Sequence, residues 1–117
     1  MRVRTLLGVA VVTVGLTAQM ASAQAGSMTY VLGDAGANHL SGGSGAQLLG
    51  GRGGDDAIRP GPGADIVRAG PGDDYVFLRN DGAVDRIHCG TGFDVVAYRF
   101  AVDRHDIIDR NCEGAIA

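Results

Sequence analysis

The chain has 117 residues, of which 20 are Gly, and its formal net charge is −3. It contains no Lys, so all ten basic residues are Arg, and twelve of the thirteen acidic residues are Asp. The missing Lys excludes a Walker-type phosphate loop, a pyridoxal Schiff base and a lysine general base. The acidic balance gives no reason to expect nucleic-acid binding.

Residues 1–23 have the three parts of a secretory signal peptide. A basic start, Met1–Arg4, precedes an apolar run from Leu6 to Leu16 and a small-x-small cleavage site at Ala21–Ala23. The apolar run is shorter than the ~20 residues that span a bilayer, which disfavours a membrane anchor. We therefore expect a secreted, extracellular protein with no membrane span in the mature chain, and a lead-in segment over residues 24–32.

Export would place the cysteines in an oxidising compartment. The sequence contains two, Cys89 and Cys112. A metal-binding pair or a catalytic thiol would need His at a suitable spacing, which neither Cys has. The sequence therefore favours a disulfide between Cys89 and Cys112.

Residues 33–77 consist of five nine-residue blocks in one unbroken register. In every block the fourth position is Gly and the eighth is aliphatic, and the sixth position is occupied in turn by Asn38, Gln47, Asp56, Asp65 and Asp74. After Phe77 the register shifts by two residues. Blocks 80–88 and 89–97 then place Asp85 and Asp94 at position six, with Ala83 where Gly is expected. Residues 98–117 do not follow the pattern, and we expect them to form a non-repeating cap that contains a strand or a short helical turn.

The blocks resemble the G-G-x-G-x-D-x-U-x nonapeptide of RTX (haemolysin-type) calcium-binding proteins. The resemblance covers residues 33–97 and is strongest in the third to fifth blocks. It implies an all-β fold, a parallel β-roll (solenoid) in which two blocks complete one eighteen-residue coil, closed here by the disulfide-bonded C-terminal cap. It also implies calcium ions between neighbouring turns, held by backbone carbonyls and by the carboxylates of Asp56, Asp65, Asp74, Asp85 and Asp94.

The residue chemistry agrees with this resemblance. Ca²⁺ prefers six to eight oxygen ligands, which carboxylates and main-chain carbonyls supply. Because side chains alternate along a strand, we expect only position eight to enter the core. Such a thin core buries too little to offset the chain entropy, so folding is expected to depend on Ca²⁺. With coils of eighteen residues, Asp74 would be the one position-six Asp with carboxylate neighbours both before and after it.

The preferred function is that of a secreted calcium-ion-binding repeat protein with a structural or interaction role. Two other interpretations of the repeats stay open. The stretch could be a disordered linker, since such linkers are often rich in Gly and Asp, or it could be a roll that has lost its ion, since Asn38 and Gln47 replace carboxylates. The alternative function is an extracellular hydrolase or lytic effector. No HExxH, EF-hand or GxGxxG motif occurs, and the three His are far apart in the sequence, so we expect no enzyme. A third possibility is an adhesive module, for which Tyr75 and Phe77 are the outward-facing aromatic candidates.

Overall fold

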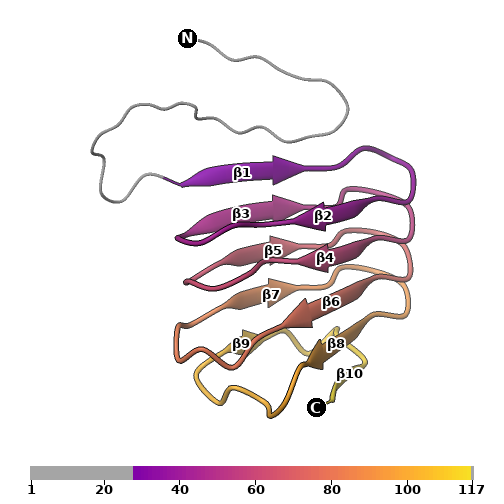
Figure 1. Ribbon diagram of the computed structural model, residues 1–117. Helices are drawn as coiled ribbons and strands as arrows, with labels where there is room; N and C mark the ends of the chain where they lie inside the picture. Colours follow the sequence, from indigo (N-terminus) through magenta and orange to yellow (C-terminus); the bar gives the residue numbers. More distant parts are fainter. Residues whose placement is uncertain (1–27, 117) are drawn as a thin grey trace, which may run out of the picture.

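The computed structural model describes residues 28–116, which form a β-solenoid of about four turns (Figure 1). The expected signal peptide and residues 24–27 of the expected lead-in lie outside the described residues, and the rest of the lead-in contains the first strand. Within residues 28–116 there is no helix, and hence none long and apolar enough to cross a membrane. The described part of the chain has ten strands: β1 (Thr29–Leu32), β2 (His39–Ser41), β3 (Gln47–Gly50), β4 (Ala57–Arg59), β5 (Ile66–Arg68), β6 (Tyr75–Leu78), β7 (Arg86–His88), β8 (Val95–Tyr98), β9 (Ile107–Ile108) and β10 (Gly114–Ile116).

The strands form two parallel sheets, one from each side of the coil. The odd sheet has the order β1-β3-β5-β7-β9 and the even sheet the order β10-β8-β6-β4-β2, so each strand pairs with the strand one coil away. Figure 1 shows the strands of the two sheets running in opposite directions, joined by turns at both sides. The all-β parallel β-roll that the sequence predicts is confirmed.

The position-eight side chains form the core between the two sheets. They are Leu40, Leu49, Ile58, Val67, Val76, Ile87 and Val96, and each is at most 6% exposed. The expectation that position eight alone enters the core is wrong, because the inward side of the chain also includes positions six and one. The position-six Asp side chains are buried, and so are Ala69 and Cys89 at position one. Alternation along an extended segment that begins before each strand explains this result.

The two-residue shift after Phe77 lengthens one coil without breaking either sheet. Ile66 pairs with Arg86 and Tyr75 with Val95, so both sheets cross the longer coil in register. Gly82 has a φ of +82° in that turn. It supplies the left-handed conformation one residue before Ala83, which explains how Ala is tolerated where the repeat has Gly.

The C-terminal segment extends the solenoid by one strand in each sheet. β9 pairs with β7, and β10 pairs with β8. The disulfide between Cys89 and Cys112 is present, with a Cα–Cα distance of 5.3 Å. It joins the residue that follows β7 to the loop between β9 and β10, and so fastens the last coil to the one before it.

Candidate functional site

A ladder of hydrogen bonds links the position-six carboxylates of successive coils. In each pair, Oδ1 of an Asp accepts a hydrogen bond from the backbone N–H of the position-six residue one coil earlier. Asp74 Oδ1 lies 2.7 Å from the nitrogen of Asp56, and Asp94 Oδ1 lies 2.8 Å from the nitrogen of Asp74. On the other side of the coil, Asp65 accepts from Gln47 at 2.9 Å and Asp85 from Asp65 at 2.8 Å. The pairing of position-six residues one coil apart, which the repeat predicts, is thus found in the structure.

Both sides of the ladder continue into the C-terminal segment. Oδ1 of Asp106 accepts from the backbone N–H of Asp85 at 2.9 Å, and Oε1 of Glu113 accepts from that of Asp94 at 2.5 Å. The expectation that Asp74 alone has carboxylate neighbours on both sides is therefore wrong, because Asp85 and Asp94 have them too. The nine-residue pattern could not find Asp106 and Glu113, since no Gly precedes either at the spacing of the repeat.

The second carboxylate oxygen, Oδ2, is free in the repeats but hydrogen-bonded at the C-terminal end of the ladder. Oδ2 of Asp56, Asp65, Asp74 and Asp94 is buried and has no hydrogen-bond partner among the described residues. Asp106 differs, because its Oδ2 accepts a hydrogen bond from the Tyr98 hydroxyl at 2.7 Å. Tyr98 thereby closes the ladder of the odd sheet at the C-terminal end.

These buried carboxyl groups resist ionisation. Burial, together with the neighbouring Asp85 carboxylate, raises the pKa of Asp65 to about 8. Burial also raises the pKa of Asp85 to about 7 and that of Asp74 to about 6, and nearby carboxylates add to both shifts. A column of carboxylates with one free oxygen each is costly to bury, so it requires either protons or a cation.

The N-terminal coils carry neutral amides at the equivalent positions. Gln47 is buried, and its Nε2 donates to the carbonyl of Ser44 at 3.2 Å, while its Oε1 has no partner among the described residues. Asn38 Oδ1 accepts from the backbone N–H of Asp34 at 2.8 Å. The amides therefore fill the position-six site at this end without adding negative charge.

A shorter ladder runs beside the first at position five. Asp55 Oδ1 accepts from the backbone N–H of Asp73, and Asp73 Oδ1 accepts from that of Phe93, both at 2.8 Å. Asp55 and Asp73 are exposed at the surface. The charge of Asp55 raises the pKa of Asp56 and Asp74 further, and the charge of Asp73 raises that of Asp94.

The oxygen ligands that the main ladder could offer are of the kind that a hard divalent cation prefers. Its free groups are carboxylate oxygens, and every turn adds backbone carbonyls, which are the ligand types that Ca²⁺ takes. Twice the 2.3–2.6 Å calcium–oxygen distance is about the 4.7–4.9 Å spacing of paired strands. Oxygens repeated once per coil are therefore spaced suitably for neighbouring coils to share an ion. Within residues 28–116, no three His, Cys, Asp or Glu side chains converge as a metal cluster, so carbonyls would have to complete the coordination.

The histidines show no catalytic arrangement among the described residues. His39 and His88 are exposed at outward strand positions, as the repeat predicts. His88 Nδ1 lies 2.6 Å from Asp109, and His105 Nδ1 lies 2.8 Å from Asp103. The first contact joins the end of β7 to the C-terminal segment, and the second lies within that segment.

No protein-family model matches the chain, and comparisons with curated proteins and with solved structures find no significant match. Its function is therefore inferred from its own residues.

Proposed function

We propose that the protein is a secreted calcium-ion-binding β-roll whose folding is coupled to Ca²⁺ and which serves a structural or interaction role. The observation that carries this proposal is the column of buried, unpartnered carboxylate oxygens on Asp56, Asp65, Asp74 and Asp94. Bound Ca²⁺ would offset their negative charge and so favour the folded state by mass action. Asp85, in the same ladder, would be the fifth carboxylate ligand.

Asp74 is central to this proposal. Its neighbours on the even sheet, Asp56 and Asp94, both have a free buried oxygen, so three consecutive coils offer one each. On the odd side, the only neighbour of Asp65 with a free buried oxygen among the described residues is Gln47, which is a neutral amide. The even side therefore supplies the longest run of coils with a free buried carboxylate oxygen among the described residues, with Asp74 in the middle.

The first experiment compares the secreted protein in excess chelator with the same protein in millimolar Ca²⁺. We expect heat of binding by isothermal titration calorimetry and a gain of β structure by circular dichroism. Mg²⁺ should substitute poorly, because it demands tight octahedral geometry and gives up water reluctantly. Identical dichroism in chelator and Ca²⁺ would overturn the coupling of folding to the ion.

A second experiment separates calcium binding from a purely structural ladder. Asp74→Asn keeps an oxygen that can accept from the backbone N–H of Asp56 but removes the negative charge. If Ca²⁺ binds here, the variant should bind fewer ions or bind them more weakly. If the ladder serves without an ion, the variant should instead be more stable than the unmutated protein, with no effect of Ca²⁺ on either. Asp109→Asn, where the side chain lies beside His88 at the surface, is the matched control and should change neither property, because a surface ion pair contributes little to stability.

A further inference from the structure

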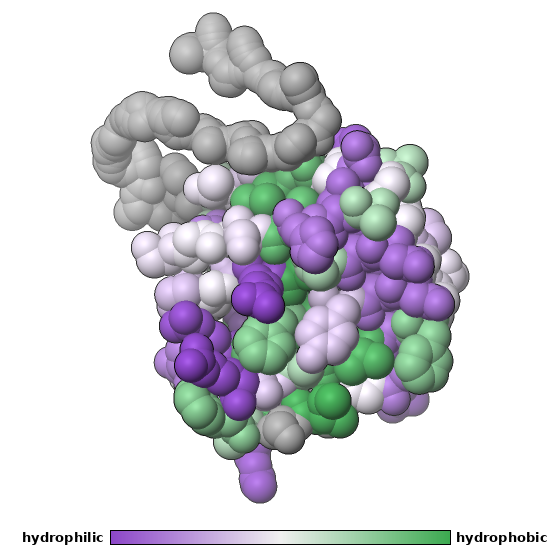
Figure 2. Space-filling view, turned by 45° about the vertical axis from the view of Figure 1, so that its right-hand side comes forward, coloured by the Kyte–Doolittle hydropathy of each residue, from purple (hydrophilic) through white to green (hydrophobic). Residues whose placement is uncertain are grey.

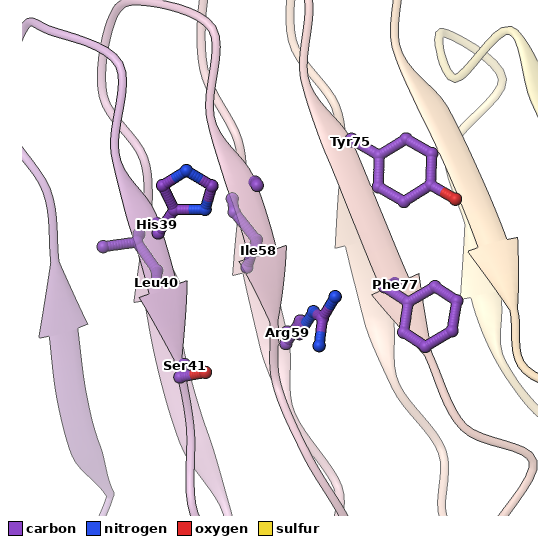
Figure 3. A pocket seen from close by; sticks show the side chains of 8 residues that line it. His39, Leu40, Ser41, Ile58, Arg59, Tyr75 and Phe77 are labelled. Carbon is purple, nitrogen blue, oxygen red and sulfur yellow. The ribbon is translucent and has the colours of Figure 1, made fainter.

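The outer face of the even sheet carries an aromatic platform beside basic side chains. Tyr75 and Phe77 project from β6 with their rings nearly parallel, at an interplanar angle of 12° and a centroid distance of 6.4 Å. The guanidinium carbon of Arg59, on β4, lies 5.3 Å from the centroid of the Phe77 ring. Figure 3 shows the two rings side by side along β6, with Arg59 on the adjoining β4 and His39 on β2 beyond it. This cation–π contact holds Arg59 against the platform.

A hollow of about 280 Å³ lies on this face, where β2, β4 and β6 run side by side. The small side chain of Ala57 lies between His39 on β2 and Tyr75 on β6, since these positions are aligned across the three strands. Ser41, Arg59 and Phe77 form the corresponding row one step along the strands. The hollow therefore has apolar rings on one side and hydrogen-bonding groups on the other.

The outer face of these strands carries no negative charge. The outward positions of β2, β4 and β6 carry no carboxylate and include the cationic Arg59, whereas the Asp residues of the repeats lie in the turns. Arg presents a planar fork of donors that matches a carboxylate. The face therefore complements a ligand with one negative group and not a polyanion, because a nucleic acid would meet the acidic turns on either side.

We propose that this face binds an acidic saccharide, with sugar rings stacked on Tyr75 and Phe77 and the sugar carboxylate paired with Arg59. The C–H faces of a sugar ring stack on flat aromatic rings, and its hydroxyls exchange hydrogen bonds with His39, Ser41 and the Tyr75 hydroxyl. A purely apolar ligand would leave those polar groups without partners. At about 280 Å³, the hollow is near the lower end of the size range of small-ligand pockets, which suits one or two sugar rings. On the side of the molecule seen in Figure 2, hydrophobic and hydrophilic side chains are interleaved, as such a mixed ligand requires.

The test is a titration of the isotope-labelled secreted protein with a tetrasaccharide that contains glucuronic acid, followed by NMR. Amide shifts should change in β2, β4 and β6, and the methyl ester of the same tetrasaccharide, which lacks the charge, should bind at least about tenfold more weakly. Arg59→Gln and Phe77→Leu should each weaken binding to a similar extent. Arg68→Gln is the matched control, because Arg68 occupies the same outward repeat position on β5 of the odd sheet, and it should bind normally.

Three results would overturn the proposal. Shifts centred on the Asp-rich turns would mean that calcium bridges the sugar to the protein. Equal binding of a glutamate hexapeptide would mean that the face recognises an acidic peptide, and an Arg68→Gln loss equal to that of Arg59→Gln would mean nonspecific charge attraction. A dispersed NMR spectrum reports the fold in every sample, so failure of sugar binding is distinguishable from failure of the calcium-dependent fold.

Discussion

Gly at position four of the inner coils allows the close approach of one coil to the next, and Gly54 provides a direct test. Gly54 has a φ of +83°, and a Cβ added there would stand 2.5 Å from the carbonyl carbon of Gly36 and 2.6 Å from its oxygen, one coil earlier. Gly82 has nearly the same φ, +82°, but an added Cβ would meet nothing within 4 Å. The pair Gly54→Ala and Gly82→Ala therefore differs in the contact with the neighbouring coil while sharing the backbone conformation.

The two substitutions should destabilise the roll by clearly different amounts. A left-handed conformation costs a non-Gly residue about 1–2 kcal/mol, which both variants incur. Gly54→Ala adds a clash with backbone that cannot rotate away, and overpacking of this kind costs about 1–3 kcal/mol more.

Urea unfolding of both variants, followed by circular dichroism in excess Ca²⁺, measures the two losses of unfolding free energy. Equal losses would show that the coils are not stacked at the distance described here. An unchanged urea dependence of the free energy would confirm that the variants bury the same surface as the unmutated protein.

Three further predictions concern the disulfide, the buried acids and one strained turn. Replacing both Cys89 and Cys112 by Ala should lower the unfolding free energy by about 3 kcal/mol, the value for closing a loop of this length; hydrogen exchange should speed up in β9 and β10 more than in β3 to β6, and uniform exchange would contradict this. Without Ca²⁺, the folded chain binds more protons than the unfolded one, because the pKa values of Asp65, Asp85 and Asp74 lie near 8, 7 and 6 in the folded state, above 3.8. Stability in chelator should therefore be greatest near pH 4 and be lost as the pH rises through 6 to 8, and urea midpoints that are equal or higher at pH 8 than at pH 5 would refute the burial of these groups. Arg52 has a φ of +75°, at a repeat position where Gly61, Gly70 and Gly90 have similar values, so Arg52→Gly should raise the melting temperature by a few degrees; a lower melting temperature would show that Arg52 makes a compensating contact.

The repeat predicts most of the fold because every coil obeys the same local rule. Gly at the turn, an aliphatic residue at position eight and Asp at position six together specify the strand, the inward face and the pairing across eighteen residues. The repeat does not predict the C-terminal segment, because Asp106 and Glu113 continue the ladder through hydrogen bonds with backbone that is distant in the sequence and not through a local motif. The repeat does predict Tyr75 and Phe77 as outward-facing aromatic residues. It misses the contact of Phe77 with Arg59, because that contact joins two strands that lie one coil apart and not a local motif.

The two residues added after Phe77 determine how the regular coils are aligned. Coils of equal length with interchangeable side chains could slide past each other by one repeat and still bury an aliphatic residue at each step. The longer coil removes that freedom, because β6 has a fourth residue, Leu78, which pairs with Tyr98 in β8. Leu78 is 1% exposed and Tyr98 is 3% exposed, so a slipped alignment would leave two large side chains without their places in the core. The two extra residues thus give the chain a single alignment of its coils. Deleting them would produce a roll in which several alignments compete.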